Sequence, residues 1–212
     1  QTLNELSRGP NLVAAVAKYF LQRRGILSLG TGLVYGFIKS RFDISLADVQ
    51  LFFVHASYAN AADRKLDREP GMTIGVSQLR PKSKGTIHVK NADPLCPPAI
   101  KPNFLDEQED KDCLIGGMQA VRRIVQQQAL QKFIDHEINP GAQVQRYDEW
   151  LDFARRNGQT IYHPVGTCRM GQDEAAVVDH KLRVRGLTGL RIVDASIMPT
   201  IVSGNTQAAV MM

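Results

Sequence analysis

Tyr-His-Pro-Val-Gly-Thr-Cys-Arg-Met-Gly at residues 162–171 is the stretch around which the 212-residue sequence is organised. His163 carries an imidazole, the side chain that changes its charge closest to neutral pH. Pro164 fixes its own backbone and favours an extended conformation at the preceding histidine. Gly166 allows a tight turn soon afterwards. The stretch therefore predicts one proton-accepting group on a locally rigid backbone.

A second polar stretch follows a short apolar run at residues 190–193, which has the pattern of a buried strand. Asp194, Ala195 and Ser196 come directly after this run. Open α/β sheets usually bind their ligands at the ends of such strands. These three residues are therefore candidates for ligand contacts.

A third polar stretch, Ser-Gly-Asn-Thr at residues 203–206, precedes an apolar-rich segment at 208–212. We predict a helix in that segment, with Asn205 or Thr206 as its N-cap. Backbone N–H groups at such a helix start can donate hydrogen bonds to a ligand.

Together the three stretches resemble the C-terminal signature of the glucose-methanol-choline (GMC) family of flavin oxidoreductases. In that family a His-Pro-x-Gly-Thr-x-x-Met motif carries the catalytic histidine. A Val-Asp-Ala-Ser-Ile-Met-Pro segment touches the flavin, and a later histidine or asparagine completes the catalytic pair. All three occur here in the family's order. The resemblance implies an enzyme that oxidises a primary alcohol, choline-like or aromatic or aliphatic, by hydride transfer to FAD.

The resemblance also implies roles for single residues. His163 would be the base for the alcohol proton. Asn205 would be its catalytic partner and would only orient the substrate oxygen, because an amide does not exchange protons near neutral pH. Tyr162 would wall the substrate pocket, or be a plain core aromatic. The residues placed against FAD, chiefly through backbone N–H groups, are Asp194, Ala195, Asn205 and Thr206.

The residues leave other interpretations open. His163 could be a hydrogen-bonded core histidine, and Asn205 a simple helix cap. Some GMC relatives bind flavin without net redox chemistry, so a lyase of the same fold, similar to hydroxynitrile lyases, is the alternative activity. Choline, an aromatic alcohol and a sugar all remain candidate substrates. No histidine has a partner at metal-ligand spacing, and no metal site is expected.

The family's phosphate-binding glycines are missing from this sequence. Members carry a Gly-x-Gly-x-x-Gly element, where a helix start holds the FAD pyrophosphate. Gly30-Thr31-Gly32 is the nearest candidate, but it lacks the third glycine. We therefore expect the C-terminal part of a larger enzyme, with its FAD-binding region upstream. Alone, the chain should bind FAD weakly and self-associate through uncovered apolar surface; an inert folded fragment is the non-enzymatic alternative.

Composition and charge are those of an ordinary globular protein, with 43% hydrophobic and 22% charged residues. The net charge of +5 comes from scattered basic residues, so a solvated surface explains it better than nucleic-acid binding.

Cys96, Cys113 and Cys168 lie far apart, which argues against disulfides and a zinc site. No apolar run approaches the roughly 20 residues needed to span a bilayer. We expect a reducing, cytoplasmic location.

Apolar periodicity predicts four helices, at residues 10–24, 106–128, 129–135 and 148–157. Alternating or apolar runs predict strands at 49–56, 72–80, 85–91 and 99–101, the second and third joined as a hairpin. The glycine-rich stretch 25–47 is expected to be a long connection.

These elements predict an α+β fold, an antiparallel sheet with helices on one face, which resembles the GMC substrate-binding domain. We place that domain at residues 1–155. Residues 156–212 are assigned to the C-terminal segment that returns to the Rossmann-like FAD-binding domain.

Overall fold

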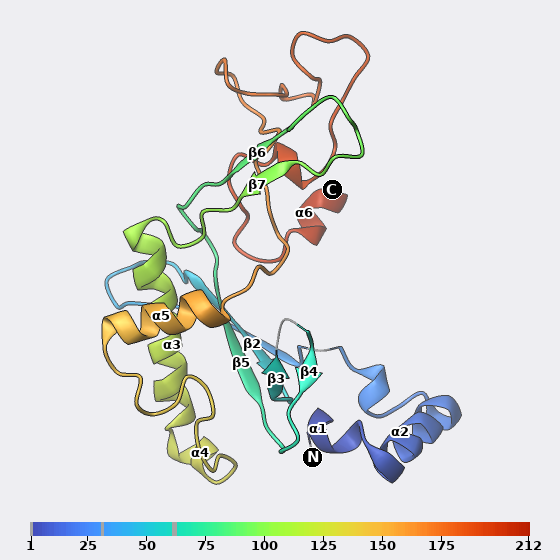
Figure 1. Cartoon of the computed structure of the whole chain (residues 1–212), viewed down its shortest axis with the longest axis vertical. Coiled ribbons are helices and arrows are strands. Elements are labelled where there is room, and N and C mark those ends of the chain that lie inside the picture. Colours follow the sequence, from blue (N-terminus) through green and yellow to red (C-terminus); the bar gives the residue numbers. More distant parts are fainter. Residues whose placement is uncertain (1, 31, 61–62) are drawn as a thin grey trace.

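A computed structural model of the chain describes residues 2–30, 32–60 and 63–212. At its centre lies a three-stranded antiparallel sheet in the order β1–β2–β5 (Figure 1). The strands are Val34–Ile38 (β1), Val49–Val54 (β2) and Thr73–Gln78 (β5). Val49 and Gln50 of the middle strand are buried. The predicted antiparallel sheet is confirmed.

Helix α3 (Gln108–Val125) packs against this sheet, and α5 (Tyr147–Asn157) packs against α3 (Figure 1). The helix lies close to the sheet at Gly117, where an added Cβ would lie 2.7 Å from a methyl group of Val76. The chain has no side chain at that point, so the helix can lie directly on the strands. The α+β fold with helices against one side of the sheet is the predicted one.

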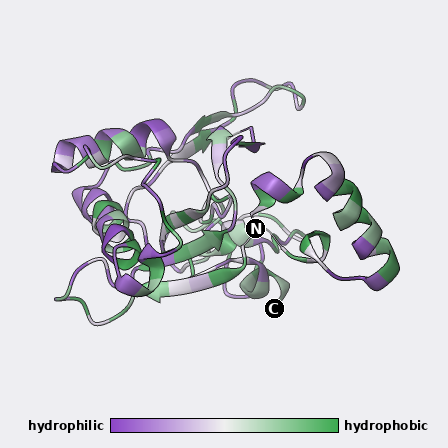
Figure 2. Ribbon diagram, turned by 90° about the horizontal axis from the view of Figure 1, so that it is seen from below, coloured by the Kyte–Doolittle hydropathy of each residue, from purple (hydrophilic) through white to green (hydrophobic). Residues whose placement is uncertain are grey.

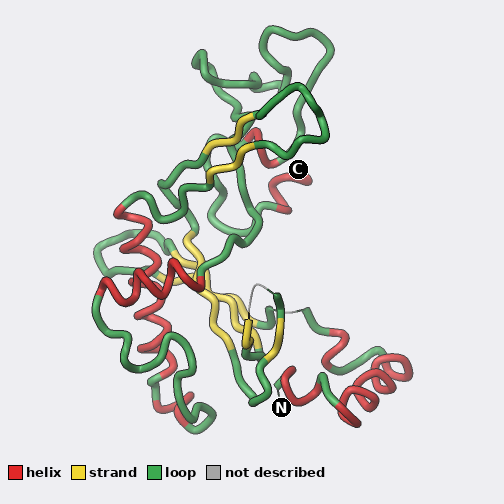
Figure 3. The backbone as a smooth tube through the Cα atoms, in the orientation of Figure 1, coloured by secondary structure: helices red, strands yellow, loops and turns green. Residues whose placement is uncertain are grey.

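The remaining elements are short, apart from α2 (Gly9–Gln22). They are α1 (Leu3–Leu6), η1 (Ile26–Ser28), β3 (Tyr58–Asn60), β4 (Lys65–Leu66), β6 (Thr86–His88), β7 (Ala99–Lys101), α4 (Gln128–Gln131), η2 (Ala195–Ile197) and α6 (Gln207–Met211). Figure 3 shows that the chain between α5 and α6 is nearly all loop. The four predicted helices are present, with ends displaced by up to four residues.

The predicted hairpin between residues 72–80 and 85–91 is wrong. β5 pairs with β2, and β6 pairs with β7. The connecting segment is drawn instead to the start of α3, where the carboxylate of Asp110 accepts hydrogen bonds from Lys82 N (2.8 Å) and Ser83 N (2.7 Å). Asp110 is 2% exposed, and Pro81 offers no N–H to a ladder. The buried carboxylate of Asp110 thus directs the backbone after β5 toward α3, and the local turn pattern does not indicate this long-range contact.

Two further expectations need correction. The stretch 25–47 is not only a connection, because it contains β1, the edge partner of β2. The run 190–193 is not a buried strand: Leu190 is 49% and Val193 65% exposed, and the only bridge in this run joins Arg191 to Arg183. A buried strand needs neighbours on both sides, and this run lacks them among the described residues. Thr31, part of the rejected glycine candidate, lies outside those residues.

Helix α2 stands apart from the sheet and is rich in hydrophobic residues (Figure 2). Val13, Phe20 and Leu21 are 70%, 67% and 84% exposed. None of the helices in the described part of the chain combines the length and the apolar character that crossing a bilayer requires.

Candidate active site

His163 is held by hydrogen bonds at both ring nitrogens. Its Nδ1 lies 2.7 Å from Thr206 Oγ1, and its Nε2 lies 3.2 Å from Asn205 Nδ2. Thr206 is buried, whereas Asn205 is exposed. The imidazole is therefore fixed from inside the molecule and faces an accessible amide. The structure brings together the two residues predicted as the catalytic pair.

The hydrogen-bond network assigns the tautomer of the imidazole. An amide nitrogen can only donate, so Nε2 of His163 must accept from Asn205. The proton of the neutral ring then sits on Nδ1 and is donated to the Thr206 hydroxyl. The carbonyl end of Asn205, Oδ1, accepts from Gln50 Nε2 over 3.2 Å. The result is an imidazole whose unprotonated nitrogen points to the open side.

The histidine segment is fastened to the segment after Asp194 by two backbone hydrogen bonds. Cys168 N donates to Ser196 O (3.0 Å), and Met170 N donates to Ile197 O (2.8 Å). The turn between His163 and these bonds is made at Gly166, whose φ of +88° suits glycine. The first two sequence stretches therefore form one structural unit.

Tyr162 takes a left-handed backbone conformation, with φ of +62°. Such a conformation is uncommon for a tyrosine and recurs at functional sites. Tyr162 is 75% exposed and therefore does not pack into the core formed by the described residues. Its position next to His163 in the chain leaves it as a candidate wall of the site.

Asp194 uses its side chain to start the short helix η2, where Oδ1 accepts from Ser196 N over 2.8 Å. Hydrogen bonds from Ser196, first from its hydroxyl and then from its backbone, hold the pKa of the carboxyl below its ordinary value. Asp194 is therefore a carboxylate at neutral pH, already engaged within the chain. Any contribution to a cofactor comes more readily from the backbone beside it.

Three backbone N–H groups fit the cofactor that this motif implies. Within the described residues, those of Ala195, Asn205 and Thr206 have no hydrogen-bond acceptor. Ala195 lies at the start of η2, and Thr206 at the N-cap of α6. N–H groups in these places can donate to carbonyl oxygens of a flavin ring. The residues present thus fit contact with a flavin, but they hold no phosphate-binding loop.

Thr206 has a role that the sequence did not indicate. It occupies the predicted N-cap position of α6, but its side chain makes no capping hydrogen bond and is turned to His163 instead. Gln50 was also missed. Its sequence signal is a single polar residue between apolar neighbours in a buried strand, which by itself names no partner.

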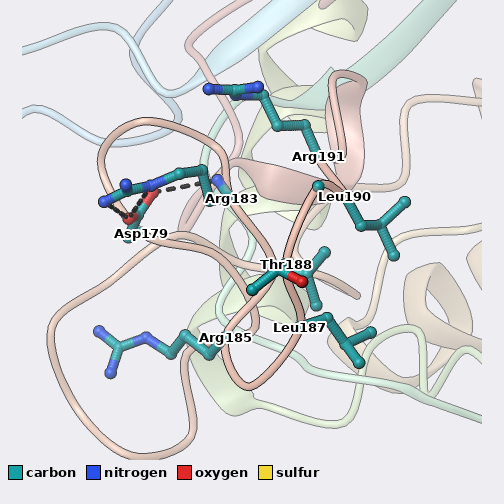
Figure 4. Close-up of a pocket in the computed structure, with 9 residues that line it drawn as sticks. Asp179, Arg183, Arg185, Leu187, Thr188, Leu190 and Arg191 are labelled. Carbon is teal, nitrogen blue, oxygen red and sulfur yellow. Dashed lines mark hydrogen bonds and ion pairs between the residues drawn. The ribbon is translucent and has the colours of Figure 1, made fainter.

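A hollow of about 460 Å³ lies elsewhere, in the loop 179–191 (Figure 4). It is lined by Arg183, Arg185 and Arg191, and Arg183 is paired with Asp179. Neither His163 nor Asn205 lines it, so it is a surface recess apart from the candidate site. In the described part of the chain no group of three or more metal-ligating side chains is found.

The fold and the motif segments of the candidate site point to one protein family. Residues 81–212 match the family described as GMC oxidoreductase, and the chain belongs to this family. The resemblance first noted in three short stretches therefore holds over most of the chain.

Named relatives agree with the family. An alcohol dehydrogenase [acceptor] of Pseudomonas putida is 40% identical over 203 residues, which are 96% of this chain and 37% of that protein. An oxygen-dependent choline dehydrogenase of Cronobacter sakazakii is 38% identical over 177 residues, 84% of this chain and 32% of that protein. The chain thus spans about a third of the length of these relatives.

Solved structures share the fold. A formate oxidase of Aspergillus oryzae RIB40 aligns with a TM-score of 0.87 at 23% identity, over 99% of this chain and 41% of that one. A pyridoxine 4-oxidase of Mesorbium loti aligns with a TM-score of 0.76 at 26% identity, over 85% of this chain and 36% of that one.

Proposed function

We propose that this chain is the catalytic C-terminal portion of an FAD-dependent enzyme that oxidises a primary alcohol, choline-like or aromatic or aliphatic. The observation that carries the proposal is the pairing of His163 Nε2 with the exposed amide of Asn205. The alcohol and choline dehydrogenases among the relatives support this substrate class. A cytoplasmic location and the division at residue 155 belong to the same proposal.

His163 acts as the base in this scheme. Its Nε2 has no proton, and its Nδ1 is held by Thr206, so the ring can take up the hydroxyl proton of an alcohol. Asn205 Nδ2 has two N–H bonds and can donate to the alcohol oxygen while it still faces the imidazole. The alcohol carbon loses a hydride and the oxygen a proton, which leaves an aldehyde. When FAD is bound, its ring supplies the hydride-accepting chemistry.

The test uses the larger FAD-containing enzyme to which this chain is proposed to belong. That enzyme is mixed anaerobically with candidate alcohols while the visible flavin absorbance is followed. Choline, benzyl alcohol and medium-chain primary alcohols are the probes. Bleaching by at least one of them, with one aldehyde formed per flavin, is expected. A protein that cleaves a hydroxynitrile without bleaching would be a lyase, and the oxidoreductase proposal would be wrong.

A further inference from the structure

Gln50 lies directly behind the proposed catalytic pair. It is in the middle strand β2, opposite Phe37 of β1 and Ser77 of β5, and only 3% exposed. Its Nε2 donates to Asn205 Oδ1 over 3.2 Å, a contact between residues 155 positions apart in the sequence. A buried amide carries both donors and an acceptor, and leaving them unmatched is costly. The side chain therefore has a specific partner, and that partner is Asn205.

We propose that Gln50 is a positioning residue that fixes which end of the Asn205 amide faces His163. By donating to Oδ1 it turns Nδ2 toward the imidazole, and Nε2 stays unprotonated as a result. The structural part of this inference stands alone, whereas its consequence for catalysis rests on the proposed function.

The direction of the hydrogen bonds carries the argument. Gln50 donates to Asn205, Asn205 donates to His163, and His163 donates to Thr206. If the Asn205 amide turned round, its Oδ1 would require a proton on Nε2. Its Nδ2 would then face the Nε2 donor of Gln50, so both amides would have to turn together. The Thr206 hydroxyl can donate or accept and selects neither state.

The neighbouring charged and titratable groups do not set the orientation of the Asn205 amide. Arg80 is tied to the same loop, since it donates to Ser203 Oγ (2.7 Å) and to Ala47 O (2.7 Å). Tyr162 precedes His163 but is turned to solvent. Within the described residues neither is hydrogen-bonded to Gln50 or Asn205. The amide of Gln50 is thus the group that contacts the carbonyl end of Asn205.

The experiment compares Gln50→Met with Gln78→Met in the FAD-containing protein carrying ¹⁵N-labelled histidine. Ring nitrogen chemical shifts report the tautomer, and the His163 signals are assigned by their loss in His163→Gln. In the unaltered protein the Nδ1–H tautomer should dominate. Gln50→Met should give a mixture of tautomers, with flavin reduction slower by about tenfold, the order of one hydrogen bond.

Gln78→Met is the matched control. Gln78 is in the neighbouring strand β5, where its Nε2 donates to Asp110 O over 2.6 Å. Its replacement removes a comparable side-chain hydrogen bond, here between strand β5 and helix α3, but should leave both the tautomer and the rate unchanged. A change as large as that of Gln50→Met would assign the effect to sheet packing and overturn the proposal.

Gln50→Glu provides a second variant of nearly the same shape, which decides the matter if Gln50→Met does not fold. Once ionised, its carboxylate can only accept, so it should turn Asn205 round and favour a proton on Nε2. A native tautomer in the ionised variant would overturn the proposal. If no alcohol reduces the flavin of the unaltered protein, the proposed function is wrong. The His163 tautomer in the Gln50 variants still tests whether Gln50 orients Asn205.

Discussion

In the proposed mechanism His163 acts as the base, with one ring nitrogen held by Thr206 and the other facing Asn205. We expect His163→Ala to slow alcohol oxidation by about 10²–10⁴, the range for loss of a general base. The FAD content should fall far less, because no hydrogen bond of His163 involves the N–H groups that fit the flavin. Stopped-flow flavin reduction and the ratio of flavin to protein absorbance measure the two effects.

His180→Ala is the control for this substitution, since His180 is exposed in a loop of the same segment. It should leave both measurements near those of the unaltered protein. Turnover close to normal in His163→Ala would show that the imidazole serves packing alone.

Cys113 should be the least reactive of the three cysteines. Its thiol donates to Asp48 Oδ2 over 3.3 Å. Burial and then the negative charge of Asp48 raise the pKa of the thiol to about 12. Because only the thiolate is alkylated, a raised pKa suppresses the reaction until the pH approaches that value. Mass spectrometry of iodoacetamide-treated protein at mildly alkaline pH should find Cys96 modified well before Cys113.

Unfolding supplies the control for the cysteine experiment. In concentrated urea the burial and the contact with Asp48 are lost, so all three thiols should react at similar rates. The expectation is contradicted if folded Cys113 reacts as fast as Cys96. All three cysteines are outside disulfides in the structure.

Sequence patterns predicted the proposed catalytic pair but not the residues that hold it. His163 and Asn205 lie in short stretches with recognisable spacing. The partners Gln50 and Thr206 act through side-chain directions that only the folded chain defines. The contact of Gln50 with Asn205 joins strand β2 to the loop before α6, and no local pattern connects those regions.

At the level of elements, α3 meets the sheet through Gly117. An added Cβ would lie 2.7 Å from Val76 and 3.1 Å from Val49. Alanine is the better helix former by about 1 kcal/mol, yet overpacking at such a contact costs typically about 1–3 kcal/mol. We expect Gly117→Ala to lower the free energy of unfolding, as measured by urea denaturation.

Gly30→Ala is the matched control, because nothing lies within 4 Å of the position of an added Cβ there. It should change stability by less than about 0.5 kcal/mol, as surface substitutions usually do. A Gly117→Ala variant with a higher free energy of unfolding would contradict this close contact between α3 and the sheet.

Elements with strong local signals were the ones predicted correctly. The periodic helices and the apolar strand β2 formed where expected. The hairpin after β5 failed because Asp110, almost thirty residues further on, binds the backbone of Lys82 and Ser83. The edge strand β1 was obscured by glycines, and its pairing depends on β2 rather than on its own composition.

At the scale of the whole molecule, the C-terminal third presents apolar side chains to solvent. Tyr162, Leu187 and Val193 are 75%, 59% and 65% exposed, and α2 exposes a further apolar side at the other end. Large exposed apolar patches mark sites of association. We expect the 212-residue chain alone to self-associate, seen as a mass above one chain in light scattering that rises with concentration. A monomer at every concentration would contradict this.

The same chain alone should hold FAD only weakly. The pyrophosphate of a dinucleotide is normally bound by a glycine-rich turn and a helix start, where backbone donors and the helix dipole act together. These 212 residues contain no Gly-x-Gly-x-x-Gly element. What they offer is the N–H groups of Ala195, Asn205 and Thr206, each bond contributing about 0.5–1.5 kcal/mol. Association itself costs at least about 4 kcal/mol, which three such bonds hardly offset.

When the purified chain is titrated with micromolar FAD, the flavin fluorescence should therefore be the same as in a titration of the urea-unfolded chain. A yellow protein with one tightly bound flavin per chain would reveal a cofactor site that does not depend on those glycines.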